Sequence, residues 1–319
     1  METISLLWGT VILRPYVFVF LAFYLAVAIL NMGVVRSLLF TVLAYLIAFL
    51  CEYSSTRNGF PFGYYTYIET TRDQELWISN VPFMDSLSFS FLIYVSYTVS
   101  LLLWAPLIKK GWDIRDTQSI KHSARVIVSA SVLCMLLDVI IDPVAFLGDR
   151  WFLGKIYFYE EAGEYFHIPL TNFAGWFFVA GLTLSCFAVL NRWLDTKIPF
   201  TPKYQLYGQA LLGPGLYFGV LIFNLGVTFY IGEILLGCVG TLISLGIFSL
   251  VFLIGCSDYN LQKFEPSAEP GEVTPEIEVD PVTYDFGPLS AGSETSDAVI
   301  NIENIGNGDL NIDNIYNCI

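Results

Sequence analysis

Polar and ionisable side chains interrupt or border the long apolar runs of this sequence at six positions. They are Glu52, Asp85, Asp138, Asp142, His167 and Asn172. Such groups are costly inside a bilayer, so each is a candidate for function. Consecutive membrane spans run antiparallel, so the end of one span and the start of the next lie on the same side. We therefore expect all six side chains to lie toward one face of the membrane.

The clearest candidate for chemistry is the pair Asp138 and Asp142, four residues apart and hence on one face of a helix. Two neighbouring carboxyl groups in an apolar setting cannot easily both be charged, because desolvation and like-charge repulsion oppose it. One of them would then hold a proton that it could donate. The alternative is structural: Asp142 caps a broken helix before Pro143, and Asp138 pairs with Arg150 or a tyrosine.

The other polar candidates also have structural interpretations. Glu52 could simply lie at the membrane interface, and for His167 an interfacial position is favoured over catalysis. Asp85 follows Pro82, and an N-terminal helix cap is its preferred interpretation.

Tyrosines and tryptophans gather beside these acids at 64–77, 151–165 and 176, including Tyr64, Tyr65, Tyr67 and Trp176. They could form an ordinary interfacial belt. Aromatic faces also stabilise cations, so the same residues would suit a carbocation intermediate.

The elements that position these groups are predicted from composition. Hydrophobic residues make up 55% of the 319 residues and charged residues only 14%, against roughly a quarter in soluble proteins. Runs long enough to cross a bilayer occur at 11–30, 34–51, 86–107, 124–147, 169–191, 206–228 and 232–255. We therefore expect an all-α integral membrane bundle of about seven transmembrane helices. The last two runs are so close that a broken or re-entrant pair is an alternative.

Basic residues predict the orientation of this bundle. They concentrate in the connections 108–125 and 192–205, whereas the connection 148–168 is rich in acids. Basic connections stay on the cytoplasmic side. The expected protein is thus a multi-pass protein of the cell (plasma or inner) membrane, with its N-terminus outside and its C-terminal tail inside.

The sequence divides into a membrane domain, 1–257, an acidic Pro/Glu-rich linker, 258–275, and a short β-rich fragment, 276–319. Beyond residue 257 lie 13 of the 29 acidic residues and a single basic one, which argues against nucleic acid as a partner. The segments Pro281–Gly287 and Ile302–Gly306 resemble the start of Ig-like repeats of the choice-of-anchor and ciliary type. A full sandwich takes about 100 residues, so we expect a partial module.

Two blocks of the membrane domain are similar to a known family. The first block comprises EYSST at 52–56, GFPFGYYTY at 59–67 and NVP at 80–82; the second comprises DVIIDPVA at 138–145 and GEYFHIPLTNFAGW at 163–176. Together they resemble the carotenoid biosynthesis membrane-protein family, which includes the carotenoid 1,2-hydratases.

The resemblance implies a cofactor-independent lyase that adds water to the terminal C1–C2 double bond of an acyclic carotenoid. Asp138 or Asp142 would donate the proton, and Glu52, with Asn172, would position water. Substrate-binding residues would be Tyr64, Tyr65, Tyr67, Asp85, His167, Asn172 and Trp176. The expected partners are the lipid-soluble carotenoid and membrane lipids, with no metal.

Three other classes stay open. A carotenoid cyclase also protonates an end group but then loses a proton. A membrane polyprenyl transferase holds diphosphate with Mg²⁺ on paired DxxxD motifs, and no second such motif is found here. A non-enzymatic transporter or receptor would also place acids inside a bundle.

Overall fold

The computed structural model describes residues 2–104, 107–108, 113–114, 118–200, 206–257, 277–280 and 301–304. The chain forms two compact units, Met1–Leu261 and Gln262–Ile319. In the second unit, β7 (Ile277–Asp280) pairs antiparallel with β8 (Asn301–Asn304). The predicted linker and the rest of the predicted β module lie outside the described residues, so those domain boundaries stay predictions.

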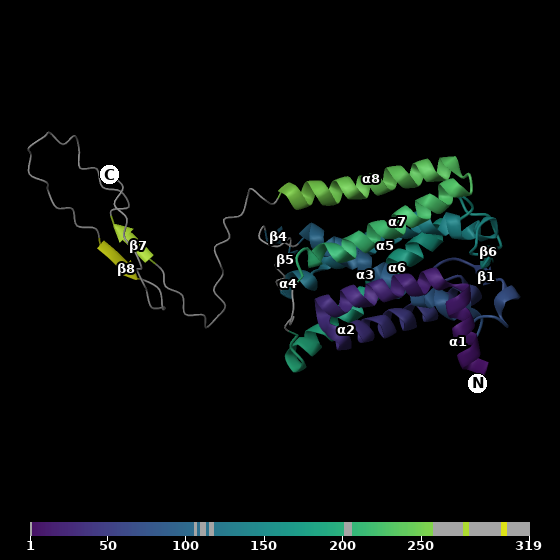
Figure 1. The fold of residues 1–319 in the computed structure, drawn as a ribbon, viewed down its shortest axis with the longest axis horizontal. Coiled ribbons are helices and arrows are strands. Elements are labelled where there is room, and N and C mark those ends of the chain that lie inside the picture. The colour runs from purple at the N-terminus through teal and green to yellow at the C-terminus, as the bar shows by residue number, and fades with distance from the viewer. Residues whose placement is uncertain are drawn as a thin grey trace, which may run out of the picture. The chain divides into compact units, whose positions relative to one another are not determined.

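The first unit is a bundle of long apolar helices (Figure 1). Its helices are α1 (Glu2–Leu13), α2 (Pro15–Asn58), α3 (Phe83–Trp104), α4 (Gln118–Lys121), α5 (Ala124–Phe146), α6 (Leu170–Lys197), α7 (Leu212–Tyr230) and α8 (Ile234–Ser257). Six of the described helices are long and apolar enough to cross a membrane. The closely spaced last pair consists of two separate helices, with a turn at Gly232, where φ is 83°.

The longest helix, α2, is a hairpin that supplies two spans. Its 44 residues would extend about 66 Å as a straight rod, twice the ~30 Å hydrocarbon layer. Gly33 breaks it with φ 81° and ψ 165°, a conformation that glycine adopts without strain. The hydroxyls of Tyr24 and Thr41 then meet at 2.8 Å across the hairpin. The described bundle therefore has the predicted seven spans, and Figure 1 shows the two halves of α2 side by side.

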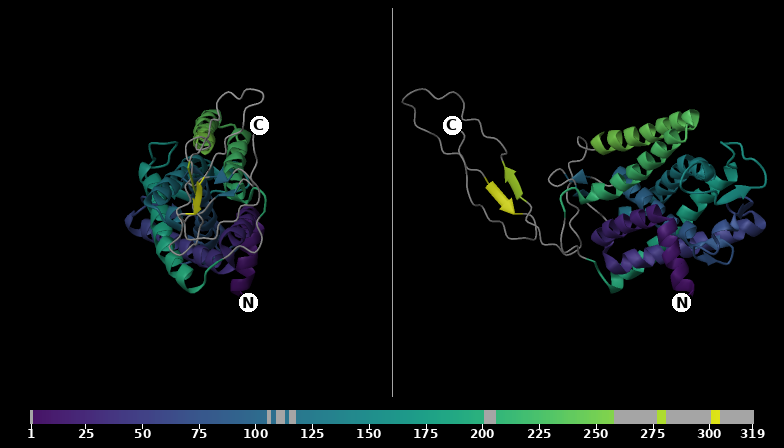
Figure 2. Two further views of the ribbon diagram at one scale, coloured as in Figure 1. Left: turned by 90° about the vertical axis from the view of Figure 1, so that its left-hand side faces the viewer. Right: turned by 45° about the vertical axis from the view of Figure 1, so that its right-hand side comes forward.

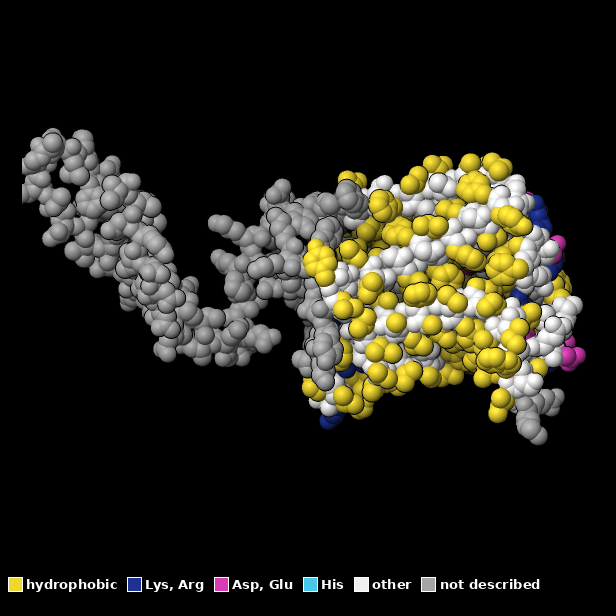
Figure 3. Space-filling view, in the orientation of Figure 1, with side chains coloured by type: hydrophobic (Ala, Val, Ile, Leu, Met, Phe, Trp, Pro, Cys, Tyr) yellow, Lys and Arg dark blue, Asp and Glu magenta, His cyan; other side chains and the backbone are white. Residues whose placement is uncertain are grey.

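Helix α3 forms the centre of the bundle. Of the residues in its 18-residue apolar stretch, 83% are buried inside the protein. Figure 2 shows the other helices around it. Small hydroxyl residues on α3 allow close approach, as where the Ser100 hydroxyl donates to the Val126 carbonyl of α5 at 2.9 Å. The outer faces carry exposed hydrophobic side chains, as the space-filling view shows (Figure 3). This distribution suits a protein whose surroundings are lipid.

At one end of the bundle, short strands join two connections that are far apart in the sequence. Strand β1 (Tyr65–Tyr67) pairs antiparallel with β6 (Tyr157–Tyr159), and β2 (Trp77–Ile78) pairs with β3 (Val81–Pro82). The β1–β6 pair ties the α2–α3 connection to the α5–α6 connection. It brings tyrosines from both over the helix ends.

A buried ion pair fastens these connections to the start of α2. The Arg14 guanidinium donates to both carboxylate oxygens of Glu75, at 3.0 and 3.2 Å, and also to the Leu153 carbonyl. Arg14 is 2% exposed and Glu75 is fully buried. Breaking a buried pair leaves an uncompensated charge, so this clamp holds the two connections in place.

The opposite end of the bundle gathers basic residues. Arg36 donates to Asn191 at 2.8 Å and to Asp195 at 2.7 Å, and Arg192 donates to the His122 carbonyl at 3.3 Å. The starts or ends of both basic connections therefore lie together, at the end away from β1 and β6 (Figure 1). Lys109, Lys110, Arg115 and Lys203, which contributed to the predicted orientation, lie outside the described residues.

The first prediction concerns orientation in the membrane. Reporter fusions after Lys121 and Lys197 should both read cytoplasmic, and a fusion within 150–165 should read external, because basic connections are retained inside. Paired accessibility reporters in whole cells measure this. An external signal at Lys121 would contradict the assignment.

Candidate active site

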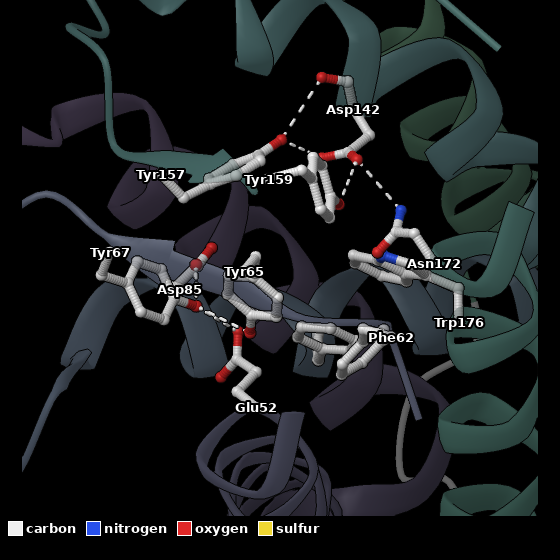
Figure 4. A pocket seen from close by; sticks show the side chains of 11 residues that line it. Glu52, Phe62, Tyr65, Tyr67, Asp85, Asp142, Tyr157, Tyr159, Asn172 and Trp176 are labelled. Atoms are coloured by element: carbon white, nitrogen blue, oxygen red, sulfur yellow. Dashed lines mark hydrogen bonds between the residues drawn. The ribbon is translucent and has the colours of Figure 1, made fainter. Parts of the chain in front are cut away.

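Four acidic residues line two cavities at the end of the bundle where β1 and β6 lie, and Figure 4 shows three of them, Glu52, Asp85 and Asp142. Glu52 is near the end of α2, Asp85 is in the first turn of α3, and Asp138 and Asp142 are in the second half of α5. Glu52, Asp138 and Asp142 are buried, with 3%, 2% and 9% exposure. The salt bridges among the described residues involve none of the four. Their negative charge must therefore be balanced by hydrogen bonds or by protons.

Asp138 and Asp142 share one amide donor. Asn172 Nδ2, on the first turn of α6, donates to Asp138 Oδ2 at 2.7 Å and to Asp142 Oδ2 at 3.0 Å. One –NH₂ group has two hydrogens, so it can serve both acids at once. Asn172 thereby fixes the two carboxyl groups relative to each other.

Two tyrosines of β6 add donors to Asp142 alone. Tyr157 donates to Asp142 Oδ1, and Tyr159 donates to Asp142 Oδ2 at 3.3 Å. Burial raises the pKa of both phenols well above the usual value, so both stay neutral donors at physiological pH. With Asn172, Asp142 accepts three hydrogen bonds and Asp138 accepts one.

Tyr67 of β1 joins the other two acids. Its hydroxyl is 3.0 Å from Glu52 Oε1 and 2.5 Å from Asp85 Oδ2, while Ser86 donates to Glu52 Oε2. Burial raises the pKa of Tyr67 well above the usual value. A neutral phenol has a single hydrogen. Tyr67 therefore either shares this hydrogen between the two carboxyl groups or donates to one and accepts from the other.

A polar cavity of about 50 Å³ lies among these groups. Glu52, Asp85 and Asp142 line it together with tyrosines of β1 and β6, as Figure 4 shows. One water needs about 10–15 Å³, so the cavity has room for roughly three or four waters. Its apolar wall includes Trp176, which stacks on Phe89 with ring centroids 3.9 Å apart.

A second, mostly apolar cavity of about 120 Å³ adjoins the first. Residues common to both linings are Asp85, Asp142, Tyr157 and Trp176, whereas Asp138 lines only the apolar one. A dry cavity of about 150 Å³ accepts a benzene-sized molecule. The apolar cavity is therefore the size of a small branched hydrocarbon group, and Asp138 is one of the residues that line it.

The structure brings most of the predicted site residues together. Eight of the ten line one cavity or both: Glu52, Tyr65, Tyr67, Asp85, Asp138, Asp142, Asn172 and Trp176. Tyr64 and His167 lie outside both linings. Tyr64 precedes β1 and is 56% exposed, and exposed His167 lies beside Phe146, with ring centroids 6.2 Å apart.

The structure contradicts the structural roles considered for Asp142, Asp138 and Asp85. Pro143 lies inside α5, so the helix continues and Asp142 does not cap it. Arg150 pairs with Glu233, and the hydrogen-bond partner of Asp138 among the described residues is Asn172, so neither Arg150 nor a tyrosine takes that place. Asp85 is the third residue of α3, where its carboxyl contacts Tyr67, so the preferred N-cap interpretation is wrong.

Four residues of the polar cavity were not selected from the sequence as site residues, namely Phe62, Phe89, Tyr157 and Tyr159, although the two tyrosines belong to the aromatic group at 151–165. Tyr157 and Tyr159 alternate with Phe158, and residues two apart in a strand share a face. That period-two pattern was a signal for a strand that presents two tyrosines together.

Residues 11–247 match the model of a protein family described as carotenoid biosynthesis protein. The chain belongs to this family. The matched range contains every residue of both cavities, so the site lies within the family's own region. This is a multi-pass membrane protein with a role in carotenoid biosynthesis, and its setting suits a lipid-soluble substrate. No curated protein and no solved structure matches the chain.

The second prediction concerns the shared amide. Asn172→Leu keeps the approximate size but removes the donor of two buried carboxyl groups, and an unsatisfied buried group costs about 1–3 kcal/mol. The free energy of unfolding of the variant in detergent should be lower than that of the wild type by this amount. Ser54→Ala, which removes an exposed hydrogen bond to Asn58, is the control and should change little. Equal stability of wild type and Asn172→Leu would show that the amide does not hold the acids.

Proposed function

We propose that the protein is a carotenoid 1,2-hydratase, which adds water to the terminal C1–C2 double bond of an acyclic carotenoid. The observation that carries this proposal is the contact between a polar cavity of water size and an apolar cavity of end-group size. Asp138 faces the apolar one, and Asp85 and Asp142 border both. Acid, water site and alkene site thus adjoin.

Asp138 is the proton donor in this proposal. Hydrogen bonds to a carboxylate favour its charged form, and Asp142 accepts three whereas Asp138 accepts one. The negative charge of the pair therefore belongs on Asp142 and the proton on Asp138. Enzymes that use a carboxylic acid as a general acid keep it neutral by placing it in apolar surroundings, and Asp138 at the apolar cavity fits this arrangement.

The reaction has two steps. The π electrons of the double bond take the proton of Asp138, which forms the C2–H bond and leaves a tertiary cation at C1. A lone pair of water then forms the C1–O bond, and the proton that water loses passes to a carboxylate of the cluster and from there back to Asp138. The sum is one added water, and no oxidant, reductant or cofactor is required.

The neighbouring groups support these steps. The face of Trp176 borders both cavities, and an aromatic face stabilises a cation by about 0.5–2 kcal/mol. Glu52, held by Tyr67 and Ser86, orders water in the polar cavity. Asn172 donates both amide hydrogens to the acids. We therefore propose that it positions Asp138 and Asp142 and does not position the attacking water.

The size of the apolar cavity supports recognition of the end group alone, because a long polyene cannot fit in about 120 Å³. One wall consists of the half-buried rings of Tyr16 and Phe20 on α2 and Phe223 on α7, which contact each other. We propose that the rest of the polyene extends past these rings into the lipid of the cell membrane.

The other enzyme classes need features that this site lacks or does not favour. The described residues contain no group of three or more His, Cys, Asp or Glu side chains suited to a metal ion, as a Mg²⁺-dependent transferase would use. A cyclase would need to keep water from the cation, whereas the polar cavity lies directly beside the acid. A transporter needs no acid aimed into an apolar cavity of end-group size.

The third prediction concerns the product. Expression in a host that makes acyclic carotenoids should yield a pigment heavier by one water. Its visible absorption should hardly change, because the hydrated double bond is outside the conjugated chain. Mass spectrometry and absorption of extracted pigments measure this. A product of unchanged mass would favour a cyclase, and a gained prenyl unit a transferase; either would overturn the proposal.

The fourth prediction separates the two acids of α5. Asp138→Asn keeps the size of the side chain but removes the transferable proton, and general acids contribute about 10²–10⁴-fold. Hydration should fall by at least ~10²-fold. Asp142→Asn should be milder, since it removes no donated proton. Turnover is measured in membranes and normalised to protein amount.

The control for this pair is His167→Ala, because His167 lies outside both cavity linings and should leave turnover nearly unchanged. Near-normal turnover in Asp138→Asn would refute its assignment as donor. If Asp142→Asn were the inactive variant instead, the roles within the pair would be reversed.

A further inference from the structure

The apolar cavity contains a polar side chain that the reaction described above does not use. Asn224, on α7, lines this cavity and is 5% exposed. Its Nδ2 donates to the Val220 carbonyl of its own helix at 2.9 Å. Its Oδ1 has no hydrogen-bond partner among the described residues. This oxygen is not one of the fully enclosed unpaired atoms of the described residues, so it is accessible and can accept a hydrogen bond from a ligand or water in the cavity.

The helix register brings Asn224 level with the acids. Helices α5 and α7 run in the same direction, and the Tyr217 hydroxyl of α7 donates to the Leu133 carbonyl of α5 at 3.0 Å. Seven residues, about two turns, further along each helix lie Asn224 and Ile140. Asn224 is therefore at the height of the interval between Asp138 and Asp142, and all three line the same cavity.

We infer that Asn224 Oδ1 accepts an O–H from the water that attacks C1, and then from the tertiary hydroxyl of the product. This inference rests on the proposed hydration. Proton donation by Asp138 forms the C2–H bond, and the water oxygen forms the C1–O bond. One proton of that water passes to Asp85, which borders both cavities, while the other stays on the oxygen and points to Asn224. The amide only accepts a hydrogen bond.

This role gives Asn224 control over the fate of the cation. A tertiary cation captures water or loses a neighbouring proton to give an alkene of unchanged mass. Asp85, Asp138 and Asp142 also line this cavity, but they are the acidic groups of the reaction. Asn224 is the acceptor that α7 adds, and it keeps the water oxygen near C1 without taking its proton.

Asn224→Leu tests the inference, because leucine has similar size and no acceptor. The matched control is Thr228→Val on the same buried face of α7; the Thr228 hydroxyl donates to the Asn224 backbone carbonyl and does not line the cavity. The readout is the ratio of hydrated product to isomerised product of unchanged mass. We expect about a three- to tenfold fall in Asn224→Leu, the effect of one hydrogen bond, and no change in Thr228→Val.

A binding measurement makes the result independent of turnover. Purified wild-type protein and Asn224→Leu are titrated with an acyclic carotenoid and with its 1-hydroxy derivative. The variant should bind the hydroxylated compound about three- to tenfold more weakly and the parent compound equally well or better. Retained binding of the parent also shows that the variant is folded; if Asn224→Leu does not fold, Asn224→Ala takes its place.

The outcomes distinguish this inference from the proposed function. If wild type hydrates and Asn224→Leu gives the same product ratio and the same binding preference, the role of Asn224 is wrong and the hydratase proposal stands. If wild type adds no water, the proposed function fails first. Equal weakening of both compounds would mean that Asn224 only shapes the cavity, which also overturns the inference.

Discussion

A carboxyl group buried in a membrane protein must be hydrogen-bonded, paired with a cation or protonated, and this constraint organises the structure around its site. None of the four acids at the site forms a salt bridge among the described residues. One amide and three phenols supply the hydrogen bonds instead, together with Ser86. Neutral donors cannot cancel four negative charges. Because burial and mutual repulsion disfavour several charged carboxylates side by side, the arrangement favours protonation of some of them, which is the property that the proposed general acid catalysis requires.

The same constraint explains why strands occur in a helical bundle. Donors from one helix could not surround carboxyl groups on α2, α3 and α5, because the side chains of a helix that point toward a given neighbour lie along one narrow stripe. The β1–β6 pair presents Tyr65, Tyr67, Tyr157 and Tyr159 over three helix ends at once. The buried Arg14–Glu75 pair then anchors the connections that carry these strands. The geometry of the site therefore depends on the Arg14–Glu75 ion pair, although neither residue lines the polar cavity.

The sequence predicted the spans well because each span must satisfy a simple length and composition rule. It also predicted that the acids converge, since antiparallel spans place successive ends on one side. It could not predict which acid receives which donor, because that depends on the register of β1 against β6, between connections some 90 residues apart. Asp85 illustrates the limit: its position after Pro82 indicated a cap, but Tyr67 reaches it from a strand. Asn224 carried no signal, because an asparagine within an apolar helix is recognisable as unsatisfied only when its neighbours are known.

The division into a polar and an apolar cavity explains how one site can hold both water and a carboxylic acid that stays protonated. Water beside a buried carboxyl group stabilises its charged form, so an acid surrounded by water would lose its proton. Asp138 borders only the apolar cavity, whereas Asp142 and Asp85 border both. The proton is thereby kept on the drier side, and charge is carried where water and phenols solvate it. In the proposed hydratase, separation of the two environments by a few side chains would allow a strong proton donor and its nucleophile to lie next to the same double bond.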